Sequence, residues 1–294
     1  LIFERKECYM NKILQFILIL IGKIPFKILY IMSEVILFFV YRIFNYRIET
    51  VQKNLKNSFP KYSLRDLIKI EKKFYRNFCD ILIENLLLFT ISKNELKKRM
   101  VLLNPEIFDT LYNKDKGAIL IGAHYNNWEW MALSLALYAK QDVYTVYKPL
   151  NNKTINDIML KARERFGANI VPMESFAKTV LKNKNRSTIN LMLADQSPHK
   201  SKVDYYCTFL NQDTPVYLGP DKLVNAANLE FLFIEVNRLK RGYYEMKIVP
   251  LCNKKNEEIG SKTILHVNHL EKIINDQPEN WLWSHKRWKN SRKK

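Results

Sequence analysis

The chain has 294 residues, of which 47% are hydrophobic, so it is long and apolar enough for one large domain or two small ones. Its formal net charge of +19 indicates an anionic partner, which leaves nucleic acid, an anionic membrane surface and acidic molecules open. Only seven glycines occur, without a glycine-rich run, which argues against a dinucleotide or P-loop site. The cysteines are far apart and show no metal-ligand spacing, so we interpret them as reduced thiols of a protein that faces the cytosol: Cys8, Cys79, Cys207 and Cys252.

The first recognisable element is a very apolar segment at residues 13–41. Charged residues and a proline interrupt it at Lys23, Pro25, Lys27 and Glu34. No uninterrupted run therefore reaches the roughly 18–20 apolar residues of a spanning helix, and no small-residue site for cleavage of a signal peptide follows. We expect two short helices, joined near residues 23–25, that lie in one leaflet of a membrane. A single kinked spanning helix, or an ordinary buried hairpin, is the alternative. The basic residues that follow are typical of a cytoplasmic flank: Arg42, Arg47 and Lys53.

Two structural helices are expected next. The first covers residues from about 42 onward and stops before Pro60. The second begins at Ser63, which is a suitable N-cap with Asp66 three positions later, and spans residues 63–90. Its inner face would carry apolar residues at helical spacing, namely Ile68, Ile70, Phe74, Phe78, Ile81 and Leu82.

The most informative stretch covers residues 117–137. It begins with the apolar residues 118–121, which are typical of a buried strand, and its pattern becomes helical from Trp128. His124 follows the strand, so we expect it at the carboxyl edge of a sheet, where open α/β sheets bind ligands. Glu129 lies in the first helical turn, where we expect its carboxylate to orient the imidazole as a general base. The plainer alternative is that His124 is a loop residue and Glu129 only a favourable charge at a helix start.

Charged and polar residues also follow two further predicted strands. These strands span residues 143–147 and 188–193, and a shorter strand opens at 170–172. The residues that follow the two longer strands, or that close the helix between them, are Lys148, Arg163, Arg165, Asp195 and Gln196.

The carboxyl-terminal third is expected to contain a helix and a strand pair. The helix starts at Gly219 and Pro220, and the strands span 231–236 and 244–249 around Arg241 and Gly242. Near the end of the chain, three residues have the spacing of one helical face, which predicts a helix that carries Trp281, His285 and Trp288.

The segment HYNNWE at residues 124–129 resembles the His-x4-Asp/Glu motif of glycerolipid-type acyltransferases. It is especially similar to the His-Phe-Gly-Asn-Trp-Glu form of the bacterial lipid A late acyltransferases, the lauroyl and myristoyl transferases. The Pro-Glu and Trp-x-His element at residues 278–285 also resembles that family, as does the amino-terminal pattern of Arg47, Val51, Asn54, Leu55, Phe59 and Pro60. The chain departs from the family at Asn126, where the family has Gly, and at Lys148, where an arginine's bidentate phosphate grip becomes a point-charge contact.

The resemblance implies an α/β fold with a mostly parallel central sheet flanked by helices and preceded by an apolar, membrane-binding helical segment. On this basis residues 1–45 form the membrane-associated segment and 46–294 the acyltransferase domain. The implied reaction is O-acyl transfer from an acyl thioester, carried by acyl carrier protein or coenzyme A, to an anionic lipid A precursor. We expect this reaction at the cytoplasmic face of the inner membrane, without a metal, a cofactor or nucleic acid.

Within that reaction, His124 and Glu129 are the expected catalytic pair. The expected substrate-binding residues are Asn127, Lys148, Arg163, Arg165, Asp195 and Gln196. The same chemistry on a lysophospholipid or an aminolipid is an alternative. A basic nucleic-acid-binding protein, or a membrane-surface protein with an inactive site, is the alternative from another class.

Overall fold

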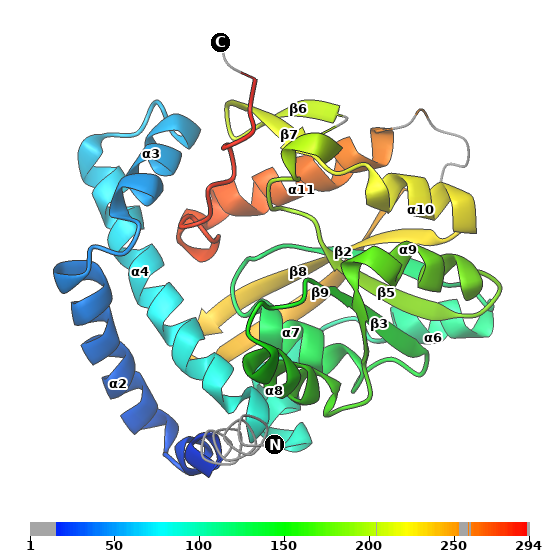
Figure 1. Cartoon of the computed structure of the whole chain (residues 1–294), viewed down its shortest axis with the longest axis horizontal. Helices are drawn as coiled ribbons and strands as arrows, with labels where there is room; N and C mark the ends of the chain where they lie inside the picture. Colours follow the sequence, from blue (N-terminus) through cyan, green and yellow to red (C-terminus); the bar gives the residue numbers. More distant parts are fainter. Residues whose placement is uncertain (1–15, 204, 253–257, 259, 293–294) are drawn as a thin grey trace, which may run out of the picture.

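The computed structural model describes residues 16–203, 205–252, 258 and 260–292. In this part of the chain, a mostly parallel sheet of seven strands has the order β1-β9-β8-β2-β5-β3-β4 and is flanked by helices (Figure 1), which confirms the predicted α/β architecture. The strands are β1 Met100–Leu102, β2 Ala118–Gly122, β3 Asp142–Tyr147, β4 Asn169–Pro172, β5 Thr188–Leu193, β8 Glu230–Lys240 and β9 Tyr243–Cys252. β8 and β9 pair antiparallel, and the other described neighbours pair parallel. A separate hairpin joins β6 Tyr205–Phe209 to β7 Gln212–Val216.

Two layers of helices bury the sheet. One layer contains α5 Lys93–Arg99, α6 Glu106–Asn113, α7 Trp128–Leu135 and α8 Lys153–Glu164, and the other contains α9 Met173–Lys182, α10 Gly219–Ala227 and α11 Ser261–Asp276. β2 lies between β5 and β8, and all five of its residues are buried. Leu120 packs into the first layer, whereas Ile119 and Ile121 pack into the second, because successive side chains of a strand point to opposite faces. A strand covered on both faces needs such a continuous apolar run.

One long helix, α4 (Leu64–Leu86), lies across the end of the sheet toward which the arrowhead of β8 points (Figure 1). Ser63 caps it by accepting a hydrogen bond from the Asp66 backbone N–H at 3.2 Å, as predicted. The helix packs Phe74 into one apolar layer and Ile83 into the other, so it braces both. It ends earlier than predicted, and a 3₁₀ turn, η2 (Leu87–Phe89), follows it.

The amino-terminal segment is broken where the sequence predicts. Residues 16–22 are helical, residues 23–25 interrupt the helix, and α2 (Phe26–Phe38) follows and packs along α4 (Figure 1). α2 buries Leu29 and Ser33 against the protein, while large apolar side chains on its outer side remain exposed: Ile28, Ile31, Val35 and Phe38. Residues 13–15 of the expected segment lie outside the described residues.

The next helix is shorter than expected. A π-helical turn, η1 (Phe39–Ile43), follows α2, and α3 (Ile48–Ser58) begins only after Arg47, which has a left-handed φ of 55°. Among the described residues no single helix has the length and apolarity to cross a membrane. The helical run Phe26–Ile43 and α3 together have enough length and apolarity, but the two are bent by 86° relative to each other. The membrane-binding role of this segment therefore stays a prediction.

The helix predicted around Trp281 and His285 is wrong. A short 3₁₀ turn, η4 (Pro278–Asn280), is followed by irregular turns. Backbone groups of this segment bond to the loop after β2 as well as within short turns, since Asn126 N–H donates to the Asn280 carbonyl and Leu282 N–H to the His124 carbonyl. The tryptophans pack together nonetheless, with ring centroids of Trp281 and Trp288 5.9 Å apart.

The buried histidine of α11 predicts a loss of stability in mild acid. Burial lowers the pKa of His266 to about 4, whereas the unfolded chain titrates near pH 6.5. Below pH 6.5 the unfolded state therefore binds the proton more readily, and the free energy of unfolding should fall by up to about 1.4 kcal/mol per pH unit until the pH reaches the folded pKa.

Thermal unfolding between pH 7.5 and 4.5, about the span of these pKa values, measures this loss. His266→Leu should flatten the dependence of the melting temperature on pH, whereas His199→Leu, a change at an exposed histidine, should leave it unchanged. Equal slopes for the wild type and His266→Leu would contradict the assignment.

Candidate active site

His124 and Asp195 are brought together by neighbouring parallel strands. β2 pairs with β5 in a register that sets Gly122 opposite Leu193. His124 and Asp195 each lie two residues beyond those positions, at the carboxyl ends of their strands. Topology therefore places them side by side at the edge of an open α/β sheet where ligands bind.

The two side chains form a tight, oriented pair. His124 Nδ1 lies 2.7 Å from Asp195 Oδ1, and the backbone N–H of His124 donates to Asp195 Oδ2 at 3.0 Å. The indole N–H of Trp281 donates to the same Oδ2 at 2.9 Å. Burial alone would raise the pKa of the Asp195 carboxyl, but the charge and hydrogen bonds of His124 and the bond from Trp281 lower it to about 2. Asp195 therefore stays ionised and accepts a hydrogen bond from the Nδ1–H group of His124. Nε2 is then the ring nitrogen with a free lone pair.

Gln196 faces the Nε2 atom of the ring, and Trp128 packs against the imidazole. The Gln196 side-chain nitrogen lies 3.1 Å from His124 Nε2, so the amide can donate to the lone pair. The Trp128 ring meets the imidazole edge-on, with centroids 5.2 Å apart. A hydroxyl that takes the place of the Gln196 amide would lie within reach of the base.

The predicted contact between His124 and Glu129 is wrong. Glu129 instead accepts two hydrogen bonds from the Arg163 guanidinium, at 2.9 Å from Nε and 2.6 Å from Nη2. The reason is the direction of the first turn of α7, which projects Glu129 toward α8, whereas the carboxylate partner of the imidazole comes from the end of β5. The charge of Arg163 is therefore already paired, with the guanidinium side chain 23% exposed and the carboxylate side chain 13% exposed.

The remaining predicted binding residues are not gathered around His124. Asn127 is fully buried, and both ends of its amide are used, because Oδ1 accepts from the Trp130 N–H and Nδ2 donates to Glu84. Arg165 donates to backbone carbonyls in and after η2, including that of Ile91 at 2.9 Å, so it clamps that turn. Lys148 is exposed just after β3. Of the predicted set, the structure joins His124, Asp195 and Gln196 in one group, and Glu129 and Arg163 in another.

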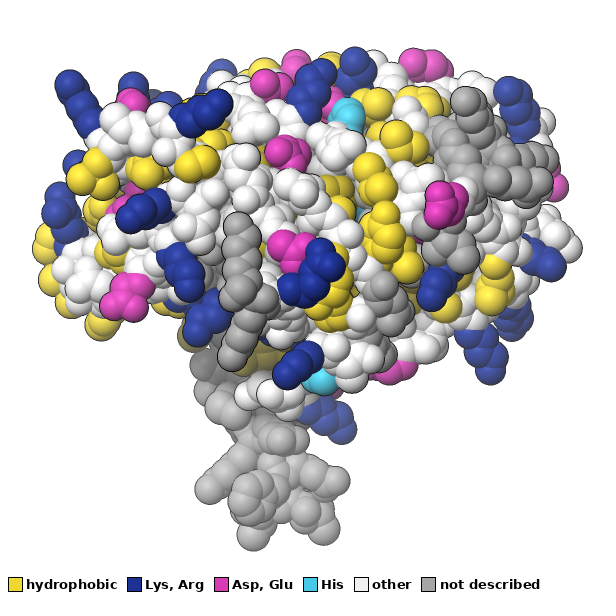
Figure 2. All heavy atoms as spheres, turned by 90° about the horizontal axis from the view of Figure 1, so that it is seen from above, with side chains coloured by type: hydrophobic (Ala, Val, Ile, Leu, Met, Phe, Trp, Pro, Cys, Tyr) yellow, Lys and Arg dark blue, Asp and Glu magenta, His cyan; other side chains and the backbone are white. Residues whose placement is uncertain are grey.

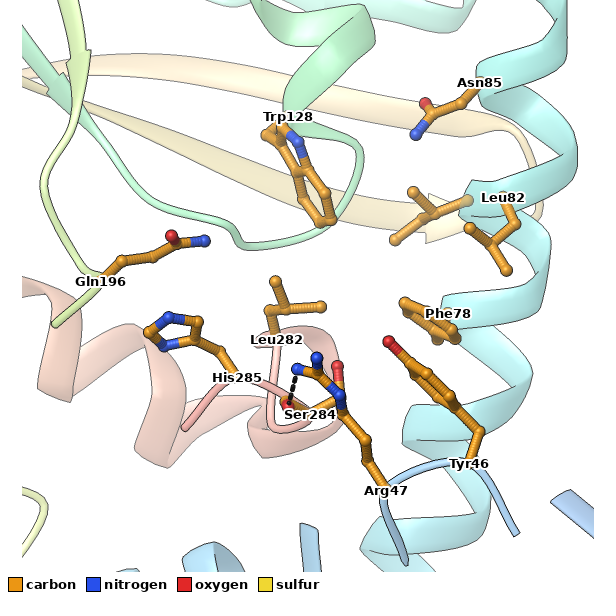
Figure 3. A pocket seen from close by; sticks show the side chains of 11 residues that line it. Tyr46, Arg47, Phe78, Leu82, Asn85, Trp128, Gln196, Leu282, Ser284 and His285 are labelled. Atoms are coloured by element: carbon orange, nitrogen blue, oxygen red, sulfur yellow. Dashed lines mark hydrogen bonds between the residues drawn. The ribbon is translucent and has the colours of Figure 1, made fainter. Parts of the chain in front are cut away.

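A pocket of about 250 Å³ opens beside this group (Figure 3). Much of its wall is apolar and comes from α4, Trp128 and Leu282, with Gln196 at the side nearest His124. Arg47 and His285 add polar groups; Figure 3 shows the Arg47 side chain reaching toward the cavity and the His285 ring turned toward Gln196. Burial lowers the pKa of His285 to about 4, so this ring is neutral near pH 7. The pocket thus combines an apolar wall with polar groups close to a base.

Sequence reasoning missed three parts of this site. Trp281 supports Asp195, Trp128 flanks the imidazole, and α4 supplies much of the pocket wall. Trp281 and His285 lie in the carboxyl-terminal element that resembles the acyltransferase family, and this resemblance was the signal that could have placed them at the site. The pocket residues of α4 looked like ordinary core positions. Among the described residues, no three His, Cys, Asp or Glu side chains form a group that could hold a metal ion.

The chain matches one family model over nearly its whole length. The model describes bacterial lipid A biosynthesis acyltransferases and covers residues 5–290. No match to the chain was found among curated proteins.

The pairing of Glu129 with Arg163 can be tested by unfolding. Arg163→Met should leave a largely buried carboxylate unpaired. The stability losses of the single variants Arg163→Met and Glu129→Gln should therefore add up to more than the loss of the double variant. The difference, which is the coupling energy of the pair, should be about 1–3 kcal/mol. The exposed pair of Arg186 and Asp142 is the matched control, with an expected coupling below about 1 kcal/mol. Purely additive losses at Glu129 and Arg163 would show that the ion pair does not form in solution.

Proposed function

The chain belongs to the bacterial lipid A biosynthesis acyltransferase family, and it is therefore an acyltransferase. On this premise we propose that it transfers a fatty acyl chain from an acyl thioester to a hydroxyl of a lipid A precursor at the cytoplasmic face of the inner membrane. The observation that carries the proposal is the pair of His124 and Asp195 beside a largely apolar pocket. Acyl transfer to an alcohol needs a base near neutral pH, and a lipid chain needs an apolar surface.

The proposed reaction proceeds without an acyl-enzyme. His124 Nε2 takes the proton of the acceptor hydroxyl while the hydroxyl oxygen attacks the carbonyl carbon of the thioester. The carbon–sulfur bond then breaks, the acyl carbon stays bonded to the acceptor oxygen, and the imidazolium gives its proton to the departing thiolate. Asp195 holds the reactive tautomer and stabilises the imidazolium, the part that sequence analysis assigned to Glu129.

Gln196 marks the place of the acceptor hydroxyl. Its amide donates to His124 Nε2, so an acceptor hydroxyl must displace it before the base can act. A displaced Gln196 remains at the wall of the pocket, where its amide can donate to a substrate oxygen. This supports the predicted substrate-binding role of Gln196.

The position of the pocket supports a lipid substrate. Tyr46 and Arg47 border the pocket, and they come shortly after the exposed apolar residues Phe39, Ile43 and Phe44 in the chain. An acyl chain that leaves a membrane surface at this point would meet Phe78, Leu82 and Trp128 on its way to His124. The apolar outer side of α2 continues this surface away from the pocket.

The charge of the protein supports an acidic partner. Lys and Arg side chains are spread over the face that carries α3 and the β6–β7 hairpin, with fewer Asp and Glu side chains among them (Figure 2). Such a distribution favours an anionic lipid surface and an acidic donor such as acyl carrier protein. Acyl coenzyme A is also anionic, so a donor assay with each thioester decides between them, and assays with lysophospholipid or aminolipid acceptors test the alternatives.

The catalytic pair makes a quantitative prediction. His124→Ala should lower kcat by about 10²- to 10⁴-fold, the range expected for loss of a general base, and Asp195→Asn should lose much of the same factor. The double variant should be little slower than His124→Ala, because Asp195 acts through the ring. The measurement is acyl transfer by the purified enzyme with a radiolabelled thioester and a lipid A precursor.

Glu129→Gln is the matched carboxylate control for that series. Glu129 bonds to Arg163 rather than to His124. The factor by which Glu129→Gln lowers kcat should therefore be the same in the wild type and in His124→Ala. The mechanism is wrong if Asp195→Asn retains near-normal kcat. It is also wrong if adding Glu129→Gln to His124→Ala lowers kcat no further while adding Asp195→Asn does.

Membrane attachment through α2 predicts a second result. The double variant Ile31→Glu/Phe38→Glu places two charges on the exposed apolar side, and it should reduce binding to phosphatidylglycerol-containing vesicles by about tenfold or more. Leu181→Glu on α9 changes an exposed leucine elsewhere and should alter binding by less than about twofold. Vesicle flotation measures the bound fraction, and undiminished binding of the double variant would refute attachment through this surface.

A further inference from the structure

Glu84 is a buried carboxylate that joins three separate elements of the protein. The residue lies near the end of α4 and is 0% exposed. Its Oε1 accepts a hydrogen bond from the Tyr30 hydroxyl of α2 at 2.9 Å. Its Oε2 accepts from the Tyr244 hydroxyl of β9 and from the Asn127 amide, each at 2.7 Å. Nothing in the reaction proposed above uses this group.

The contacts of Glu84 end directly on the catalytic turn. Asn127 lies between His124 and Glu129 and caps α7 through its Oδ1, while its Nδ2 is held by Glu84. The backbone carbonyl of Glu84 also accepts from the Trp130 indole at 3.1 Å. α4 therefore fixes both the start of α7 and its first turn, and with them the loop that carries the imidazole.

The opposite arm of the same group leads to the exposed apolar helix. Tyr30 comes from α2, whose outer side carries Ile31 and Val35. One turn earlier on α4, Asp80 accepts a hydrogen bond from Ser33 of α2 at 2.6 Å, which seats the same helix without touching the catalytic turn. The hydrogen bond between Tyr30 and Glu84 thus leads from α2 through one side chain to Asn127. Phe26 of α2 also touches Trp130 of α7 directly, but this is a ring contact without a hydrogen bond to the cap.

A buried carboxyl group makes this link stiff. Burial raises the pKa of Glu84 above its ordinary value, and the hydrogen bonds from Tyr244, Asn127 and Tyr30 and the positive charge of Arg238 offset only part of this rise. Removing any donor leaves the carboxyl under-solvated in a site without exposed surface, so the remaining donors must shift toward it. A shift of Asn127 moves the cap of α7 and the loop that precedes it.

We propose that Glu84 is a positioning residue for acyl transfer, which couples the seating of α2 on the protein to the geometry of the turn that carries His124. The inference rests on the proposed function. Its physical content is that a change in how α2 packs at the lipid surface reaches the catalytic turn through the chain from Tyr30 to Glu84 to Asn127. Substrate contacts in the pocket are not part of this chain.

Two tyrosines of the amino-terminal segment give a matched test. Tyr30→Phe removes the hydroxyl that donates to Glu84, whereas Tyr41→Phe removes a hydroxyl that donates to Glu71 of the same helix at 2.9 Å, far from the catalytic turn. We expect Tyr30→Phe to lower kcat by about tenfold with KM for both substrates within about twofold, since a hydrogen bond to a buried carboxyl group is lost but no substrate contact is. Tyr41→Phe should keep kcat within about twofold of the wild type, although it should lower the melting temperature about as much as Tyr30→Phe does.

A second cycle follows the link to its end. Asn127→Ser keeps an oxygen that can cap α7 but removes the amide that donates to Glu84. In this background Tyr30→Phe should cost little further kcat, because the two changes break one chain. Glu84→Gln, which keeps one acceptor oxygen, should retain more kcat than Glu84→Leu, and melting curves establish that each variant is folded.

The outcomes separate this inference from the function on which it rests. If the wild type transfers acyl groups and His124→Ala does not, but Tyr30→Phe and Tyr41→Phe have the same kcat, the inference is overturned and the function stands. Strictly multiplicative losses for Tyr30→Phe and Asn127→Ser overturn it as well. A wild-type enzyme without acyl transfer overturns the function and the inference together.

Discussion

His124 and Asp195 meet because β2 and β5 are parallel neighbours whose register sets Gly122 opposite Leu193. The chain must therefore complete the centre of its sheet before the pair exists. Trp281 then closes the pair from the far end of the chain by donating to the same carboxylate. The pKa of the buried Asp195 carboxyl is lowered to about 2, so its carboxylate can accept a hydrogen bond from the Nδ1–H of the neutral imidazole and leave Nε2 free.

α4 determines what surrounds that pair. It packs against both apolar layers, supplies much of the wall of the pocket, and holds the catalytic turn through Glu84. The same helix seats α2, whose other side is apolar and exposed. A single helix therefore lies between the surface proposed to meet lipid and the base proposed to act on it.

Much of the fold followed from the sequence because its signals are local. The apolar run of β2, the cap at Ser63 and the break near Pro25 depend on neighbouring residues, and the structure has all three. The irregular segment after Pro278 was missed because its backbone bonds to the loop at His124, more than half the chain away.

The site shows the same division between local and distant information. His124 was placed correctly at a strand end, but the partner of its ring was assigned to Glu129, which is close in sequence, rather than to Asp195, which is close in space. Choosing between two carboxylates required the strand order, and spacing along the chain cannot supply it. Glu84 gave no signal, because a glutamate in an amphipathic helix ordinarily faces solvent.

The most direct test of the account is the ¹⁵N NMR spectrum of the His124 ring in the wild type, Asp195→Asn and Glu129→Gln. The account predicts that Nδ1 carries the proton in the wild type, that Glu129→Gln preserves this tautomer, and that Asp195→Asn loses it. A ring that keeps its tautomer in Asp195→Asn and changes it in Glu129→Gln would contradict the central claim that Asp195 orients the base.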